Sequence, residues 1–444
     1  MSTYKIEKLL FYPAKFNLYE SIFEHLDLSI LKEQTYKTGR KPFCRQAICR
    51  ALVYKNLKAI KTLSELTFEL ATNLGIGYVL GFDKQPPSRH RFEEFLHKTP
   101  NQLLQAIRKA QIKTLVELGV ISGEYLSIDS TPVVAWVKQN NPKMFVEGKF
   151  DKSKFPQGDP DARLGFMAIK RKPNHSKEQQ LELFDAPSDK NKFGKEVILF
   201  WGYRNHVIFD ALSELPVFEK TLPANVSDCI VTVPAFKELR KYLKLNNPKG
   251  VLADAAHDSI SIRKYIRRSL QAKDFIPVNP RAKKYDIKLT PDNIRICIAG
   301  LQMYPWGKFK EGNRLRRKFV CPITHLKNLA NKFNHQCPIN HPRFFKGGCY
   351  ANVSLDQRYR QSTIDPKSEH FKKIYKMQSG SERGFSRLLN FYMQRPVLTG
   401  LAAVSNHCTL AHISILAIAI AAVKAEQNSK FRYIRGLLKH FLQR

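Results

Sequence analysis

The 444-residue sequence predicts a mixed α/β fold with a helical region at its N-terminus. Three observations lead to this prediction. Residues 1–110 show helical periodicity, residues 111–289 contain short apolar runs that alternate with helices, and helical periodicity returns after residue 366. Hydrophobic residues at 43% and charged residues at 25% are typical of a folded chain, and the length allows two or three domains.

The charge of the chain is strongly unbalanced. Lys and Arg together number 74 against 38 acidic residues, which gives a formal net charge of +36. Such an excess disfavours a compact protein unless a polyanion offsets it, and nucleic acid is the usual polyanion. Ribosomal and membrane-surface proteins are also basic, but they are generally shorter or carry an amphipathic basic helix. The charge therefore favours nucleic acid as the partner.

The N-terminal region contains two helix signals. Residues 62–65 (TLSE) have the form of a capping box before an apolar run. Further on, Ser88 is positioned to cap a helix that carries Arg89 and Arg91. A helix, a turn and a basic helix are typical of a DNA-reading helix-turn-helix, but also of a plain helical bundle with a solvated basic face.

The pattern of the remaining chain predicts a sheet with an insertion. Strands are expected at residues 125–133, 215–224, 250–256 and near 274–285, and residues 196–210 are expected to form a strand pair or one long strand. Between the first two, residues 140–195 are polar and aperiodic, which predicts a long surface excursion. The expected segments are a helical DNA-binding or assembly domain (1–110), the first part of the core (111–289), a β-rich cysteine-containing insertion (290–365) and the last part of the core (366–444).

No membrane segment is expected. The apolar run at residues 408–426 is interrupted by His412 and its core is too short to span a bilayer, so it predicts a helix buried in a large core. The first residues lack the apolar run of a signal peptide. Eight cysteines without such a signal favour a reducing, cytoplasmic environment over a disulfide framework.

Three acids stand at special positions. Asp129 lies near the end of the first predicted strand, which Pro132 is expected to terminate, and Asp254 ends a later one. If these strands are neighbours, both carboxylates leave the sheet at one edge. Glu382 precedes an apolar helical stripe by one turn and is expected to face the sheet with it. The stripe consists of Phe385, Leu388, Leu389 and Tyr392.

Clustered carboxylates need a cation. Three acids in a dry cleft would raise one another's pKa values or destabilise the fold. Two divalent ions about 3.5–4 Å apart take hard oxygen ligands, which carboxylates supply better than histidine or thiol. Magnesium or manganese bound there would polarise a phosphodiester and activate a water or a 3′-hydroxyl, while basic neighbours hold the DNA backbone.

The order of these motifs resembles that of the DDE transposases of bacterial insertion sequences, whose catalytic core is ribonuclease H-like. SIDSTPV is similar to the first acidic motif of that family, and VLADAAHDS to the second, with VNPR as its sequel. GYRNHVIFDALSELPVFEKTLPANVSD resembles the second and third strands, and IYKMQSGSERGFSRL the helix with the glutamate. The N-terminal region resembles the helical domain that often precedes this core, so the resemblance covers most of the chain.

The resemblance implies that Asp129, Asp254 and Glu382 are catalytic residues that bind two Mg²⁺ or Mn²⁺ ions. Asp258, four residues beyond Asp254, is a rival that is expected to cap the following helix instead. Contacts to DNA are expected from arginines near these motifs, in the N-terminal region and in the insertion. They are Arg89, Arg91, Arg281, Arg314, Arg316, Arg317, Arg383 and Arg387.

The sequence departs from the family pattern around the glutamate. In that pattern a Tyr is followed three residues later by Arg, and a Lys follows the Glu by seven. Tyr375 fits, but Gln378 and Leu389 stand at the other two positions. The departure concerns the subgroup and some DNA contacts, and leaves the three acids in place.

The insertion carries two further features. Cys297, Cys321, Cys337 and Cys349 are candidate ligands of a structural zinc ion, or are unligated thiols, because no two of them form the close pair of a zinc ribbon. The stretch 304–319 has six basic residues around aromatic ones, which suits contact with DNA. For its tryptophan, Trp306, packing inside a solvated basic hairpin is favoured over stacking on an unpaired base.

We therefore expect a transposase that binds the inverted ends of its own element, cuts phosphodiester bonds and joins the 3′-hydroxyl to target DNA. Its partner would be double-stranded DNA in the nucleoid of a prokaryotic cell, and two ends require two active sites, so a homodimer on DNA is expected. The alternatives are a catalytically inactive, transposase-derived DNA-binding repressor and a nuclease of the same fold that cuts without joining.

Overall fold

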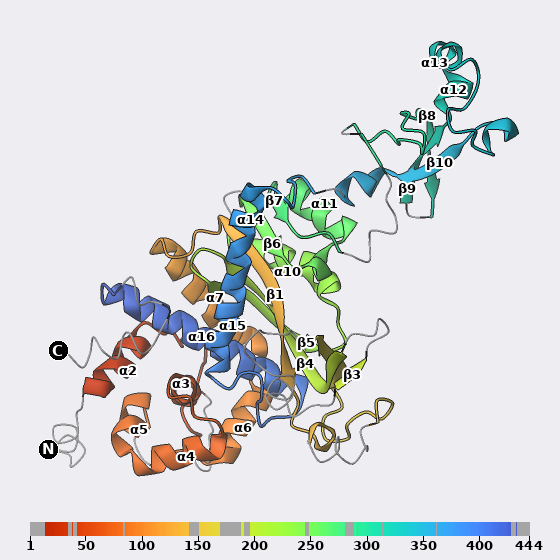
Figure 1. Cartoon of the computed structure of the whole chain (residues 1–444). Coiled ribbons are helices and arrows are strands. Elements are labelled where there is room, and N and C mark those ends of the chain that lie inside the picture. Colours follow the sequence, from red (N-terminus) through yellow and green to blue (C-terminus); the bar gives the residue numbers. More distant parts are fainter. Residues whose placement is uncertain are drawn as a thin grey trace. The chain divides into compact units, whose positions relative to one another are not determined.

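The computed structural model describes residues 14–33, 38, 42–82, 85–141, 151–168, 188–190, 196–244, 248–279, 288–290, 292–312, 314–360, 362–427 and 432. The chain forms two compact units (Figure 1). The larger unit is Met1–Pro248 with Lys376–Arg444, and the smaller unit is Lys249–Tyr375. These limits differ from the four segments expected from the sequence, whose boundaries stay a prediction.

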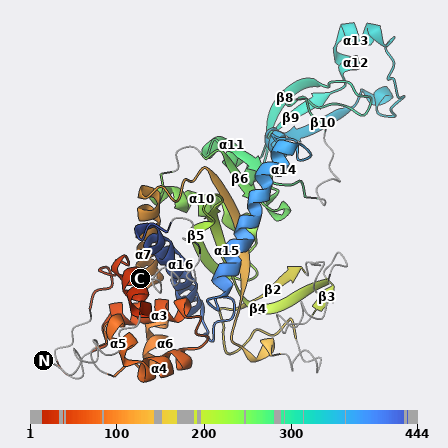
Figure 2. The same ribbon diagram turned by 60° about the vertical axis from the view of Figure 1, so that its left-hand side comes forward.

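In the larger unit, helices of the N-terminal region surround one long apolar helix, α16 (Leu401–Lys424). The surrounding helices with direct packing on α16 include α2 (Ala14–Glu24), α3 (Arg45–Leu57), α6 (Arg89–Lys98) and α7 (Asn101–Glu117). The helices α4 (Leu63–Thr72) and α5 (Leu74–Leu80) complete the layer. Figures 1 and 2 both show α7 and α16 side by side.

The burial of α16 agrees with the prediction of a core helix. It is long and apolar enough to cross a membrane, but 94% of its apolar window is buried inside the protein. Two of its buried polar side chains bond to the helices of the N-terminal region. Asn406 donates from Nδ2 to the carbonyl oxygens of Leu96 (2.7 Å) and Thr99 (2.8 Å), and Ser414 Oγ accepts from Asn56 Nδ2 at 3.1 Å. These bonds join the helical region to the core.

The sheet of the larger unit is built on β4, a long strand whose apolar sequence EVILFWGYRNHVIFD covers Glu196–Asp210. All its neighbours are antiparallel to it. They are β1 (Tyr125–Val134), β2 (Arg163–Ala168), β3 (Ser188–Lys190) and β5 (Leu215–Pro223). In β1, Leu126 lies opposite Asp210 and Val134 opposite Gly202.

Helices lie on both faces of β1. On one face α10 (Asp228–Tyr242) contacts β1, β4 and β5. On the other, α15 (Ser379–Leu389) contacts β1 and β4 after the short turn η6 (Lys376–Gln378) (Figure 2). Alternate side chains of β1 therefore meet different helices.

The smaller unit has two parts. In the first, β6 (Gly250–Ala253) and β7 (Lys273–Phe275) form a parallel pair. The chain between them forms the short turn η2 (Ala255–His257) and the helix α11 (Ile260–Ser269). The second part is a three-stranded antiparallel sheet with short helices at one end (Figure 2). Its elements are β8 (Tyr304–Glu311), β9 (Arg314–Val320), α12 (Pro322–His325), α13 (Lys327–Lys332), η4 (Phe344–Lys346) and β10 (Tyr350–Ser354). η5 (Leu355–Arg360) and α14 (Glu369–Tyr375) end the unit.

The predicted α/β class with antiparallel and parallel strand pairs is confirmed, and so is the capping box. Thr62 is the N-cap of α4, and its Oγ1 accepts from Glu65 N at 3.1 Å. Two details were wrong. Pro132 does not end β1, because a proline fits a strand wherever its missing N–H is not needed in the ladder. The excursion 140–195 also contains β2 and β3, which extend the sheet.

Part of that excursion is docked on the core. Asp159 is fully buried, where its Oδ1 accepts from Tyr203 Oη at 2.5 Å. Its Oδ2 accepts from Gly400 N, and Asp161 Oδ2 accepts from Leu401 N, both at 2.9 Å. The two carboxylates thus bind the first amide groups of α16, where a negative charge is favourable.

Candidate active site

Asp129 lies on the face of β1 that α15 covers. Two residues before it, Ser127 is fully buried with its Oγ 2.7 Å from the Oγ of Ser381 in α15. Two residues after it, Thr131 Oγ1 accepts from the side chain of Gln394. Because alternate residues of a strand share a face, Asp129 points to the same side. Its carboxylate is half-buried, and its Oδ1 accepts from Ser130 N at 2.8 Å.

Small residues allow α15 to approach the sheet. A Cβ on Gly384 would lie 2.5 Å from Cε1 of Phe209 in β4, so only glycine fits there at this spacing. The next residue, Phe385, packs edge-on against the same ring, with a centroid distance of 5.1 Å. The helix is therefore held close to β4 by one glycine and one aromatic pair.

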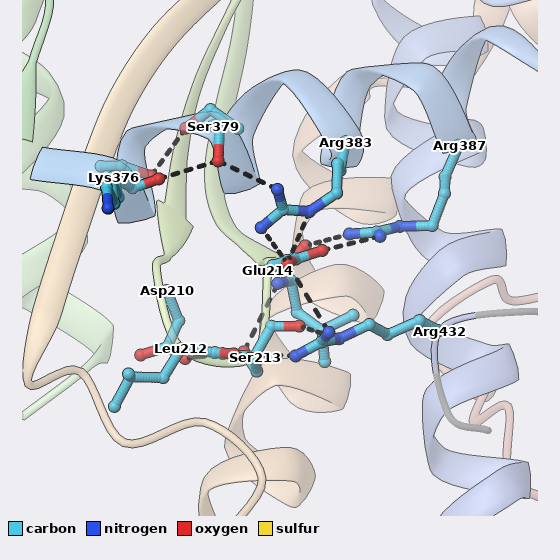
Figure 3. Close-up of polar contacts among 12 residues, drawn as sticks. Asp210, Leu212, Ser213, Glu214, Lys376, Ser379, Arg383, Arg387 and Arg432 are labelled. Carbon is cyan, nitrogen blue, oxygen red and sulfur yellow. Dashed lines mark hydrogen bonds and ion pairs between the residues drawn. The ribbon is translucent and has the colours of Figure 1, made fainter. Parts of the chain in front are cut away.

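A buried carboxylate anchors the same helix (Figure 3). Glu214 lies in the turn between β4 and β5 with φ of 59°, a left-handed conformation that is unusual for glutamate. Its Oε1 accepts from Arg383 Nε (2.9 Å) and Nη2 (2.7 Å), and its Oε2 accepts from Arg387 Nη1 (2.9 Å). Arg432 Nη1 lies 3.6 Å from Oε1. Three guanidinium groups thus converge on one acid.

The electrostatics of Glu214 follow from these contacts. Burial acts to raise its pKa, but the hydrogen bonds from Arg383 and Arg387 and the charge of Arg432 outweigh it, so the pKa lies below the usual 4.5. The ionised carboxylate therefore holds the middle and the last turn of α15 through Arg383 and Arg387. Nothing local in the sequence around Glu214 indicated this role, because its partners lie about 170 residues further along the chain.

Glu382 occupies the first turn of α15 and is exposed. The prediction that it shares the buried stripe was wrong. The buried side of α15 includes Ser381, Gly384, Phe385 and Leu388, whereas Leu389 and Tyr392 are each 39% exposed. Glu382 thus follows the serine that contacts Ser127 and lies outside the packed face of the helix.

Asp254 lies in the smaller unit, directly after β6. Its Oδ1 accepts from Ala256 N at 3.0 Å and lies 2.8 Å from His257 Nδ1, and its side chain is 55% exposed. The rival Asp258 is only 4% exposed, with its Oδ1 accepting from Arg263 Nε (2.9 Å) and its Oδ2 from Asn279 N (2.8 Å). Asp258 therefore has structural partners, and Asp254 is the acid that faces solvent.

The donor chemistry of the three acids suits a hard divalent ion. Asp129 is half-buried, whereas Glu382 and the side chain of Asp254 are exposed, so ions can reach them. Within the described parts of the chain, no three His, Cys, Asp or Glu side chains already stand together at positions that could hold a metal. Within the larger unit, Asp129 and Glu382 come from two elements that contact each other, β1 and α15.

The arginines expected to contact DNA fall into different environments. The side chain of Arg387 is only 7% exposed and donates from Nη2 to the carbonyl oxygen of Glu214 as well, which argues against contact with phosphate. The side chain of Arg383 remains 54% exposed beside the same acid. Arg89 and Arg91 are exposed on α6 and pair with the glutamates of their own helix.

The remaining arginines belong to the smaller unit. Arg316 pairs with Glu311 across the β8–β9 hairpin at 2.5 Å, and Arg317 lies opposite Lys308. Arg281 and the side chain of Arg314 lie outside the described residues.

Trp306 is 60% exposed on β8, so the expectation that it packs inside the hairpin was wrong. Its ring meets His325 edge-on with a centroid distance of 5.0 Å, and Tyr304 stacks on the same histidine at 6.3 Å. The physical reason is that β8 packs almost none of its side chains, since nearly all of its residues are exposed.

A second acid that was not singled out in the sequence lies on the opposite face of β1. Asp228 begins α10, and its Oδ1 is 3.0 Å from Nδ1 of the buried His206. Burial acts to raise the pKa of Asp228, but His206 and the charge of Arg204 outweigh it and the pKa is lowered. Because α10 covers this face, Asp228 is separated by the sheet from Asp129.

Comparison with known proteins identifies the class to which this fold and these acids belong. Residues 174–417, just over half of the 444 residues, match the family model described as "Transposase DDE domain". The chain therefore belongs to the DDE transposases, a family of enzymes that act on DNA, as the resemblance of its motifs implied. The matched range includes Asp254 and Glu382 and begins after Asp129.

Residues 10–98 match a second model, described as "Transposase domain (DUF772)". No curated protein matches the chain. Similar solved structures include the cryo-EM structure of the piggyBac transposase synaptic complex with hairpin DNA. It is 11% identical, with a TM-score of 0.39, and the alignment covers 97% of this chain and 80% of that chain.

Proposed function

We propose that this DDE transposase binds the inverted ends of an insertion sequence, cleaves them by metal-dependent hydrolysis and joins the 3′-hydroxyl to target DNA. The observation that carries the proposal is the pairing of β1 with α15, through the contact of Ser127 with Ser381. This contact brings an acid-bearing strand and an acid-bearing helix together in a chain that belongs to a DNA-transposing family.

Asp129, Asp254 and Glu382 are proposed as the ligands of Mg²⁺ or Mn²⁺, in a site for two ions. Their hard carboxylate oxygens and the solvent access of Asp254 and Glu382 support this assignment. The bound ions would supply an activated water or 3′-hydroxyl and stabilise the leaving oxygen. The protein's own part is to hold Asp129 in a paired strand and Glu382 at the start of a helix that Glu214 fixes.

The smaller unit is proposed to hold the DNA backbone. On the β8–β9 hairpin, Lys308 lies directly opposite Arg317. Like charges at directly opposite positions destabilise a sheet, and a bound phosphate backbone would offset this. The exposed rings of Tyr304 and Trp306 on the same strand are available for stacking on a base.

Two element ends must be cut and joined together, so a homodimer assembled on DNA is proposed. The net charge of +36 supports assembly on DNA, since two such chains repel each other strongly until phosphates neutralise them.

The test uses the purified full chain, DNA that carries the inverted repeats flanking its gene, a supercoiled plasmid and Mg²⁺ or Mn²⁺. The proposal expects specific end binding, cleavage at the repeat and covalent joining of the end to the plasmid. Cleavage without joining would indicate a nuclease, and binding without cleavage a DNA-binding repressor. Either result would overturn the proposed reaction. DNA with scrambled ends is the matched control, and it should be neither cut nor joined.

A further inference from the structure

The insertion brings together four cysteines that lie far apart in the sequence. Cys321 directly follows β9 and Cys349 directly precedes β10. These strands are antiparallel, with Val320 opposite Tyr350, so the two cysteines occupy the next pair of opposite positions. Cβ atoms at such positions are about 5 Å apart. The backbone agrees, since a Cβ on Gly348 would lie 3.1 Å from the Cβ of Cys321.

Cys297 and Cys337 reach the same region from two loops. Cys297 packs, like Cys349, against the small apolar cluster of the β8–β10 sheet. Cys349 also packs against the second small cluster, to which Cys321 belongs. Cys337 lies four residues before His341, and the Nδ1 of His341 is 3.1 Å from the Sγ of Cys349. Cys349 is therefore the common neighbour of the other three segments.

All eight cysteines of the chain are free thiols. Across the described ranges, no set of three such ligands already stands at metal-binding positions.

The apolar core around these cysteines is small. Among the residues that the structure describes, one cluster has Met303, Phe319 and Val353 as its buried members, and the other has Cys321, Ile323 and Ala330. Modules with so little buried apolar surface generally depend on disulfides or a structural metal for stability. Because disulfides do not persist in a reducing cell, a structural metal is the means of stabilisation that remains there.

We propose that Cys297, Cys321, Cys337 and Cys349 bind one structural zinc ion that holds the insertion together. Four thiols lose their protons to solvent and form four Zn–S bonds, and no electron is transferred. The resulting charge of −2 is offset by basic side chains next to the cluster. Arg343 and Lys318 both lie against the ring of Tyr350, the residue after Cys349, and the Nδ1 of His341 is 3.1 Å from the Sγ of Cys349.

This site is independent of the proposed reaction, because its soft sulfur donors differ from the carboxylates suited to Mg²⁺. The test measures zinc by mass spectrometry on the purified full chain after dialysis against zinc-free buffer. We expect one zinc per chain, and near-zero zinc in Cys321→Ser and Cys349→Ser. Cys44→Ser is the matched control. Cys44 caps α3 by accepting from Ala47 N, a position that serine fills well, so this variant should keep its zinc.

A second measurement keeps the proposal testable if the serine variants do not fold. The unaltered chain is treated with iodoacetamide before and after a zinc chelator, and the modified cysteines are identified by peptide mass spectrometry. The proposal expects Cys297, Cys321, Cys337 and Cys349 to be protected together and to become reactive together. Three results would overturn it. They are sub-stoichiometric zinc in the unaltered chain, unchanged zinc in the serine variants, or a disulfide between Cys321 and Cys349 in the chain isolated without reductant.

Discussion

Arg387 and Glu214 form a buried ion pair that ties the helix carrying Glu382 to the turn between β4 and β5. Arg387 Nη1 lies 2.9 Å from Oε2 of Glu214, and the two side chains are 7% and 6% exposed. Figure 3 shows Arg383 and Arg432 approaching the same carboxylate. The pair therefore ties the last turn of α15 to the turn between β4 and β5.

Replacement of Arg387 by alanine should destabilise the larger unit by about 1.5–3 kcal/mol, because it removes the buried charge-assisted hydrogen bond to Glu214 while Arg383 and Arg432 remain beside the carboxylate. Arg383→Ala is the matched control on the same helix. Its side chain is 54% exposed, so the expected loss is about 1 kcal/mol or less. Urea unfolding followed by tryptophan fluorescence measures both values. Equal losses in the two variants would contradict the buried role of Arg387.

The contribution of Glu214 should depend on pH. Its folded pKa is lowered below 4.5, so the ionised form stabilises the fold. This stabilisation is complete above pH 4.5 and is lost as the pH falls below that value. Glu214→Gln removes the titrating group. The difference in melting temperature between the unaltered chain and this variant should be largest near neutral pH and should shrink on acidification. A difference that grows at low pH would contradict the prediction that the ionised form of Glu214 stabilises the fold.

Gly384→Ala should displace α15 from the sheet. The added Cβ would lie 2.5 Å from the ring of Phe209, and overpacking of this kind costs about 1–3 kcal/mol. Gly77→Ala provides the control, since Gly77 is also helical but has no atom within 4 Å of the added Cβ. That change should be neutral or stabilising by up to about 1 kcal/mol. Thermal unfolding of the two variants compares them directly, and an unaffected Gly384→Ala variant would refute the close packing.

Lys308→Ala should weaken binding to DNA of any sequence and reduce the slope of log affinity against log salt by about 1, as expected for one lost phosphate contact. Lys113→Ala on α7 is the control, because that lysine is 78% exposed and belongs to another part of the molecule. Fluorescence anisotropy at several salt concentrations gives the slope. An unchanged slope for Lys308→Ala would remove the β8–β9 hairpin from the DNA interface.

The strands β1, β4, β5 and β6 could be predicted from the sequence because each contains an apolar run, whereas β2 and β3 lie in the polar excursion and were missed. Residues 196–210, expected to form a strand pair or one long strand, form the single strand β4. The orientation of Glu382 could not be predicted, because α15 packs through Gly384 and Ser381, small residues that add nothing to a hydrophobic pattern. Tyr392 seemed to extend the stripe but has φ of 55° and lies beyond the helix.

Contacts between residues far apart in the sequence could not be predicted either. No local pattern links Glu214 to arginines in α15, since the contact depends on how the β4–β5 turn meets that helix. The cysteines have no close pair in the sequence, and the antiparallel register of β9 and β10 is what brings Cys321 opposite Cys349. Spacing rules detect ligands from one loop, and they miss ligands that a sheet brings together.

The most direct test of the central claim measures end cleavage by Asp129→Asn, Asp254→Asn and Glu382→Gln in Mg²⁺. Each change removes one carboxylate charge at nearly constant size. Each should lower cleavage at least about 100-fold, since losing several kcal/mol of charge stabilisation costs a factor of ten for every 1.4 kcal/mol.

End binding should stay intact in all three variants. Glu369→Gln, at an acid that is 89% exposed on α14, is the control and should cleave normally. If all three variants lose cleavage but keep binding, the metal-binding triad is supported. Normal cleavage by any one of them would contradict it and remove that acid from the site.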